Sequence, residues 1–297
     1  MGRRSIKQIS SNKRIIKLLI PFLFFFTLIF GLGLIEVLKS SFGIFEYTKT
    51  NITFDYYIKI LTDVNFYKSL LYTIYLGVIP TFLSVTIGVL LASIVYLNCQ
   101  RIFRGFKVLL LPNIISYSIC TFVVILIFMQ TGIISRILFN TGIINNPNAF
   151  PLFIYDKYGI GIMLVYLLKQ VPFVFLIVYS TLLKRGNNLI KIAKILGANN
   201  TIIIFKIIIA GIKTTIYSVG FLCFAFNFGS FEVPFILGNP KYESLSLMAY
   251  KYYSSPSVEQ KPLAMVINVI ILCISIAILY LFIKKREKSN ETRTIDY

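Results

Sequence analysis

The amino-acid sequence predicts an all-α, polytopic membrane protein with six transmembrane helices, and three observations lead to this prediction. Hydrophobic residues make up 57% of the 297 residues and charged residues only 14%, whereas soluble domains contain roughly 45–50% and 25%. Apolar runs of about 20 residues recur along the chain, which is enough to cross a hydrocarbon core about 30 Å thick. The segments that join these runs alternate between strongly basic and mixed charge.

Each apolar run is expected to form one membrane-spanning helix, including those that contain Pro or Gly, because neighbouring helices can satisfy the freed backbone groups. The expected limits are Leu18–Leu38, Ser69–Leu97, Val108–Gln130, Gly159–Leu183, Thr214–Leu237 and Leu263–Ile283. The first run follows a basic N-terminus, as in a signal peptide, but it exceeds the 7–15 residues of a signal core and no small-residue cleavage site follows it. It is therefore expected to be a retained first helix.

The charge of the connecting segments predicts the orientation of the chain. Residues 1–17, Asn98–Lys107, Lys184–Lys213 and 284–297 are basic, whereas Ser40–Lys68, Thr131–Tyr158 and Gly238–Pro262 mix both signs. Because basic segments stay in the cytoplasm, both termini are expected there, which agrees with an even number of helices. The same pattern explains the net charge of +19 without a nucleic-acid partner.

These limits divide the chain into a cytoplasmic N-terminus (1–17), a first helix (18–38), an external segment (39–68), a five-helix core (69–283) and a cytoplasmic tail (284–297). The external segment contains a short aromatic stretch, Phe54–Leu61, which is expected to lie as a helix on the outer surface. The core includes the basic loop 184–213, whose stretch from Leu189 to about Ala210 has helical character but is too basic for lipid.

That basic loop contains a motif of small residues. The motif consists of Lys191, Ala193, Leu196, Gly197 and Ala198, and the apolar stretch Ile207–Ala210 follows it. Small residues let a short helix approach a partner closely, and glycine permits a sharp turn. The motif resembles the "EAA" loop of ABC-importer permeases, which forms a coupling helix docked in a groove of the ATPase subunit. It departs from that loop at Lys191, Ile192 and Ala210, where the family usually has Glu, Ala and Pro.

Two further stretches strengthen the resemblance, which covers about Phe54 to Ile283. Leu109–Asn113 and Phe228–Gly238 look like the branch of importers for polyamines, ferric iron, thiamine and aminophosphonates. The resemblance implies a type I ABC-importer permease in the bacterial cytoplasmic (inner) membrane. It also implies a second permease subunit, identical or homologous, two ATPase subunits that bind ATP and Mg, an external solute-binding protein and membrane lipid as partners.

The chain itself is not expected to hydrolyse ATP or to hold a cofactor. A P-loop needs a Gly-Lys pair before Ser or Thr so that backbone N–H groups can cradle phosphates. The nearest approach, Gly211–Thr215, lacks that pair. Since the chain has no histidine, a His-ligated zinc site and an imidazole proton relay are also excluded.

Polar side chains inside the expected helices are candidates for the substrate pathway, because an uncompensated charge in the bilayer must face protein or water. Lys169 and Glu232 are expected to line the pathway and to pair in one state of the transport cycle. Asn227 and Ser230, three residues apart on one helix face, are candidates for contact with substrate. All three residues of the fifth helix face one cavity only if Gly229 and Pro234 distort that helix. A structural ion pair, separate snorkelling side chains and polar contacts between helices remain open as alternatives.

Two other classes of protein fit this sequence less well. An ion-coupled secondary transporter often shows internal repeats and buried acidic or histidine relays, and here only Glu232 is well placed as an acid. A membrane-embedded enzyme would need clustered nucleophiles, carboxylates or metal ligands, and the sequence shows no such cluster. The substrate itself stays open, since Glu232 favours a cation and Lys169 an anion.

Overall fold

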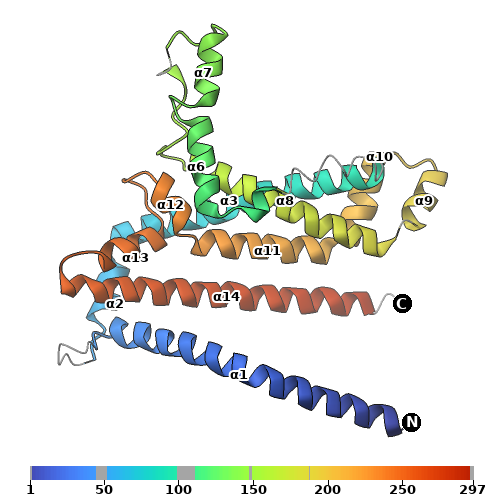
Figure 1. Ribbon diagram of the computed structural model, residues 1–297, viewed down its shortest axis with the longest axis horizontal. Helices are drawn as coiled ribbons and strands as arrows, with labels where there is room; N and C mark the ends of the chain where they lie inside the picture. The colour runs from blue at the N-terminus through green and yellow to red at the C-terminus, as the bar shows by residue number, and fades with distance from the viewer. Residues whose placement is uncertain (1, 45–51, 99–110, 147–148, 187, 295–297) are drawn as a thin grey trace. The chain divides into compact units, whose positions relative to one another are not determined.

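The computed structural model describes residues 2–44, 52–98, 111–146, 149–186 and 188–294 (Figure 1). Every regular element within these ranges is helical. The longer helices are α1 (Gly2–Ser41), α3 (Val64–Asn98), α6 (Tyr117–Phe128), α8 (Ile160–Arg185), α11 (Lys213–Gly229) and α14 (Lys261–Thr294). The shorter ones are α2 (Asp55–Thr62), α5 (Leu111–Ile114), α7 (Ile133–Asn140), α9 (Asn188–Ile195), α10 (Asn200–Ile202), α12 (Glu232–Leu237), α13 (Leu245–Tyr253), the π-helix η3 (Ile203–Ile209) and the 3₁₀-helix η4 (Val258–Gln260).

Five stretches of the described chain are long and apolar enough to cross a membrane, and a pair of helices bent by 75° adds a sixth when it is counted as one span. The five are Leu19–Ser41, Val64–Leu97, Tyr117–Asn140, Ile160–Arg185 and Val258–Lys284, and the bent pair is Asn200–Ile209 with Lys213–Gly229. The predicted fold class, an all-α protein with several membrane-spanning helices, is therefore confirmed. Four of the six expected helices lie close to their expected limits.

The chain forms two compact parts, Met1–Asp63 with Ala249–Leu272 and Val64–Met248 with Cys273–Tyr297. In the smaller part, the apolar side chains of α1 between Leu19 and Leu38 are largely exposed. The end of α1 contacts α2, because the hydroxyls of Ser41 and Tyr57 lie 2.8 Å apart and the rings of Phe42 and Tyr57 lie 5.4 Å apart. The short aromatic stretch expected at Phe54–Leu61 is indeed a helix.

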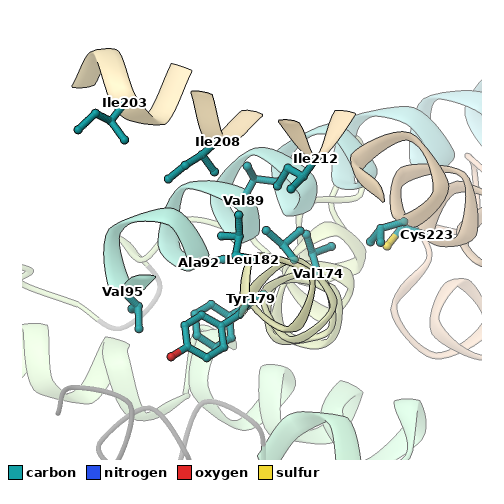
Figure 2. Close-up of a cluster of buried hydrophobic side chains, with 13 residues drawn as sticks. Val89, Ala92, Val95, Val174, Tyr179, Leu182, Ile203, Ile208, Ile212 and Cys223 are labelled. Atoms are coloured by element: carbon teal, nitrogen blue, oxygen red, sulfur yellow. The ribbon is translucent and has the colours of Figure 1, made fainter. Parts of the chain in front are cut away.

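The larger part is built on three helices, α3, α8 and α11, which pack side by side (Figure 1). Figure 2 shows the apolar core at one end of this group. The core is formed by Val89, Ala92 and Val95 of α3, Val174, Phe175, Val178, Tyr179 and Leu182 of α8, Ile203, Ile208 and Ile212 around η3, and Val219 and Cys223 of α11. Helices α9 and α10 lie at one end of the group and α12 at the other (Figure 1).

The third expected helix, Val108–Gln130, is wrong in its limits within the described residues. The chain forms the one-turn helix α5, breaks, and resumes at Tyr117, where the hydroxyl of Ser116 caps the new helix by accepting from the N–H of Ile119 at 3.3 Å. Beyond Gln130 the chain turns helical again in α7, within the segment expected to be a loop. Residues 108–110 lie outside the described ranges.

The fifth expected helix, Thr214–Leu237, is wrong as a single element. Helix α11 ends at Gly229, Ser230 adopts an extended conformation with φ −67° and ψ 133°, and α12 begins at Glu232. The helix distortion that a common cavity for these residues would require is therefore present next to Gly229, as a complete break. A hydrophobic run does not reveal such a break, because both helices have the same apolar character.

The loop between α8 and α11 is helical in three pieces rather than one. Helix α9 is followed by a turn, by α10 and then by η3, a π-helix of seven residues. The axis of residues Asn200–Ile209 meets that of α11 at 75°. π-helices are rare and often occur at functional sites. The sharp bend between η3 and α11 is called the elbow below.

Candidate functional site

The motif that resembles a coupling loop forms helix α9 and the turn that ends it. The N–H of Gly197 donates to the carbonyl of Lys194 at 3.1 Å, and the N–H of Ala198 donates to the carbonyl of Ala193 at 3.0 Å. This pair of hydrogen bonds is a Schellman motif, which satisfies the free carbonyls at a helix end and needs a left-handed residue. Gly197 supplies it with φ +79°, so glycine at this position is required by the turn.

The residues of this motif divide between two sides of α9. Ala193 and Ala198 are partly buried and pack against the core of the larger part, together with Ile190. Ile195 and Leu196 point away from it and are 84% and 81% exposed. The small residues therefore let α9 lie close to its own core, and two large apolar side chains remain uncovered at the tip.

A continuous set of packed side chains joins this tip to the long helices. η3 contacts both α9 and α3, and Ile203, Ile208 and Ile212 are at least 97% buried against α3, α8 and α11 (Figure 2). Because close-packed interiors transmit displacement, a movement of α9 acts on α3, α8 and α11 through these isoleucines.

Lys169, in the middle of α8, is only 8% exposed and is held by the segment around α5. Its ammonium group donates to the carbonyls of Pro112, at 2.9 Å, and Ile115, at 2.5 Å, and lies 4.8 Å from the centre of the Tyr117 ring. Carbonyls at a helix end lack partners within the helix, and a cation satisfies them well. Lys169 therefore stabilises the break between α5 and α6.

Glu232 is exposed at the start of α12 and accepts a hydrogen bond from the hydroxyl of Ser118 at 3.2 Å. In this conformation Lys169 and Glu232 do not form the expected pair, because each has its own partners. Both nevertheless contact residues 112–118, one from α8 and the other from α12. The stretch around the α5–α6 break thus connects the two charged candidates of the pathway.

Asn227 and Ser230 do not form a common polar face. Asn227 is 3% exposed, exchanges hydrogen bonds with the amide of Gln170 and donates to the hydroxyl of Thr81 at 3.1 Å. Ser230 instead accepts a hydrogen bond at its carbonyl from the hydroxyl of Ser246 at 2.8 Å. Direct contact between Asn227 and a solute therefore requires a rearrangement of α3, α8 and α11, and the role of both residues stays a prediction.

The amide pair gives a first testable prediction. Replacing Asn227 with leucine leaves the buried amide of Gln170 without its partner, so the free energy of unfolding should fall by about 1–3 kcal/mol. Replacing Gln170 and Asn227 together with leucine should restore most of this loss, since neither amide is then left buried without the other. Thermal unfolding of the purified single and double variants measures both effects. Equal losses that simply add would contradict the assignment of the pair.

The described residues also line a half-open cavity of about 800 Å³ between α3, η3, α11 and the middle of α14. Its walls are almost entirely apolar, with Lys213 at the beginning of α11 as the charged residue. None of the four expected pathway residues lines it. Thr81 belongs both to its wall and to the hydrogen bonds of Asn227, so the amide pair lies directly behind the cavity.

Comparison with solved structures identifies proteins that have the same fold. No family model matches the sequence. The structure is similar to a chain of a bacterial ABC transporter involved in the import of the acidic polysaccharide alginate, with a TM-score of 0.77 and 17% identity over 96% of this chain and 99% of that one. This is the fold of an ABC-importer permease. A bacterial alginate ABC transporter in complex with a periplasmic protein bound to an alginate pentasaccharide gives a TM-score of 0.73 and 18% identity over 93% and 94%.

The fold class that the sequence predicts is thus confirmed, while the individual site residues stay predictions. Several side chains of the site were not singled out from the sequence, namely Ile195, Gln170 and Tyr117. Ile195 and Leu196 lie side by side in an otherwise basic segment, and this pair of large apolar residues was a usable sign of a docking surface. Gln170 follows Lys169 directly, and an amide inside an apolar helix was likewise visible.

Proposed function

We propose that this chain is the membrane-spanning subunit of an ATP-driven importer and that α9 with its terminal turn docks on an ATPase subunit. The observation that carries the proposal is the pair Ile195 and Leu196, uncovered at the tip of a helix whose opposite side packs on the core. Large exposed apolar side chains at a rigid tip are typical of a protein-binding surface. The fold, shared with chains of ABC importers, supports the same function.

The proposed assembly contains a second permease subunit, two ATPase subunits that bind ATP and Mg, and an external solute-binding protein. The chain lies in the bacterial cytoplasmic membrane, with the basic segments, α9 and both termini on the cytoplasmic side, as the positive-inside rule requires. Movement of α9 on nucleotide binding would then shift α3, α8 and α11 between two packed arrangements.

The proposed solute is small and polar and is delivered by the binding protein. Resemblance in sequence points to the polyamine, ferric iron, thiamine and aminophosphonate branch, whereas the similar solved structures come from transporters of alginate. Glu232, exposed on α12 and supported by Ser118, is the proposed contact on the pathway, with Ser230 beside the break. Lys169 and Asn227, both buried, are proposed to hold the pathway helices in place in this conformation.

The decisive experiment removes the docking surface. Replacing Ile195 and Leu196 together with aspartate should weaken binding of the ATPase subunit by about 30-fold, the factor for a hot-spot loss of about 2 kcal/mol. The amount of ATPase that co-purifies with the tagged chain in detergent measures this loss. Leu152→Asp, 64% exposed ahead of α8 at the opposite end, is the matched control and should retain the ATPase. Unchanged binding by the double variant would refute the proposed docking surface.

A further inference from the structure

The loop that carries α9 is clamped at its base. Arg185 is the last residue of α8, where the chain leaves the long helices. Its guanidinium Nη1 donates to the carbonyl of Gly211, where the chain returns towards α11. The two ends of the loop are therefore joined by one side chain, although they are 26 positions apart in the sequence.

Gly211 makes room for this contact. A β-carbon at position 211 would lie 2.9 Å from both Cζ and Nη1 of Arg185, closer than such atoms approach in proteins. The guanidinium is the far end of a flexible side chain, so an alanine at this position would push it aside and leave the helices where they are. Glycine at 211 and arginine at 185 thus form a matched pair.

The clamp lies at the elbow, where the chain bends by 75° between η3 and α11. Ile212, at the bend, has a non-helical conformation with φ −104° and ψ 16°. On the η3 side of the bend, the N–H of Ile212 donates to the carbonyl of Ile208 at 3.0 Å. On the α11 side, the N–H of Ile216 donates to the carbonyl of Ile212 at 3.0 Å. Both bonds end at Ile212 itself, so a contact from another element contributes to the angle of the bend.

The other flank of the loop is also fixed to the helices. Gly186, which follows Arg185, has φ +79° and accepts a hydrogen bond at its carbonyl from the hydroxyl of Tyr96 on α3 at 3.3 Å. The loop is therefore tied to α3 at its start and to α8 at its end. A charge-assisted bond such as that of Arg185 is stronger and more directional than a neutral one.

We propose that Arg185 is a positioning residue that fixes the angle of the elbow, so that a displacement of α9 is passed to α11 and not absorbed by bending. This inference rests on the proposed function, because it needs a partner that displaces α9. A rigid joint transmits motion, whereas a free hinge lets η3 swing while α11 stays still. Loss of the clamp should therefore uncouple the two ends of the subunit without removing the docking surface.

The test uses the full chain assembled with its co-purified ATPase in lipid nanodiscs. The four native cysteines are replaced, and spin labels are attached to cysteines at Leu168 of α8 and Leu222 of α11, which are 37% and 52% exposed. The distance distribution between the labels is recorded without nucleotide and after ATP and vanadate have been added, so that ADP and vanadate stay trapped on the ATPase. ATP hydrolysis is measured on the same preparations before vanadate is added.

In the chain with Arg185 intact, trapping the nucleotide with vanadate should shift the distance distribution. In Arg185→Ala and Arg185→Gln the shifted population should fall about tenfold while ATP hydrolysis continues, a change typical of lost coupling between sites. Gly211→Ala should reproduce this loss, and Arg185→Lys should restore part of the shift, because lysine keeps the positive charge and its bond to the carbonyl of Gly211 stays charge-assisted, unlike that of glutamine. Gly220→Ala in α11, whose new β-carbon meets only Val85 at 3.6 Å, should behave like the unmodified chain.

An ATP-dependent shift of full size in Arg185→Gln and Gly211→Ala would overturn the inference. A bound ATPase that produces no shift even in the chain with Arg185 intact would overturn it as well, because α11 then does not respond to α9. Failure of any ATPase to bind the unmodified chain is a different result, which refutes the proposed function itself.

Discussion

Replacing Lys169 with methionine is expected to lower the free energy of unfolding by about 2–4 kcal/mol, because two partly buried carbonyls, those of Pro112 and Ile115, lose a charged partner. The ammonium of Lys169 bonds to Pro112 and Ile115 and lies over the ring of Tyr117. Methionine fills similar space without a donor. The break between α5 and α6 should then loosen, and with it the hydrogen bond of Ser118 to Glu232.

Two measurements check this expectation. Thermal unfolding of the purified protein should occur roughly 5–10 °C lower, given a few degrees per kcal/mol for a chain of this size. Hydrogen exchange should rise in residues 111–119, which report local opening of this segment. Lys184→Met, an exposed lysine of the same helix, is the control and should stay within about 0.5 kcal/mol. Equal stability of the two variants would mean that Lys169 does not hold the break.

Lys169 also shows which features of this structure the sequence can predict. The membrane-spanning segments follow from hydropathy, because burial in lipid depends mainly on the apolar character of about 20 consecutive residues. Positions 169 and 232 stand out for the same reason, since a charge in such a run is costly. Their partners do not follow from it, because the carbonyls that bind Lys169 come from a segment more than 50 residues away.

The breaks in the helices lay beyond this kind of reasoning. The interruption at Ser116 depends on a side-chain cap, and the one at Ser230 follows Gly229 in a run that remains apolar on both sides. Local sequence permits both a continuous and a broken helix there, and packing against α8 and α12 decides between them. Ala193 is a different case. The sequence shows that a small residue stands at this position, but it does not show that the surface packed against it is the core of the same chain.

In the motif that resembles a coupling loop, the sequence similarity and the geometry give different information. Sequence similarity singled out Leu196, Gly197 and two alanines without distinguishing their roles. In the structure Gly197 makes the turn, the alanines face inward, and Leu196 with Ile195 faces outward. Lys191 is exposed on α9 as well, so a lysine in place of the usual glutamate leaves the fold of this segment unaffected.

The second large effect is expected at Gly88, where α3 lies close to α8. A β-carbon at this position would lie 2.7 Å from Cβ and Cγ1 of Val174 and 3.1 Å from the carbonyl oxygen of Val171. The Cβ of Val174 and the carbonyl of Val171 are fixed to the backbone of α8, so no change of rotamer can relieve the contact. Small residues serve this purpose between membrane helices, where close packing replaces the hydrophobic effect as the source of stability.

Gly88→Ala should therefore force α3 and α8 apart and cost about 1–3 kcal/mol, and Gly88→Leu should cost more than about 3 kcal/mol. Thermal unfolding in detergent measures both, and Gly220→Ala provides the comparison, because its β-carbon finds an ordinary contact with Val85 at 3.6 Å. The core residues Val89 and Ala92 on α3 and Val174 and Val178 on α8 lie beside this contact. Separation of the two helices should thus also weaken the packing of Ile208 and Ile212, which connect α9 to the membrane-spanning helices. In the Gly88 variants, the stability of the protein and the transmission of movement from α9 to these helices should therefore fall together. A Gly88→Ala protein as stable as Gly220→Ala would show that α3 and α8 are not in close contact at this point.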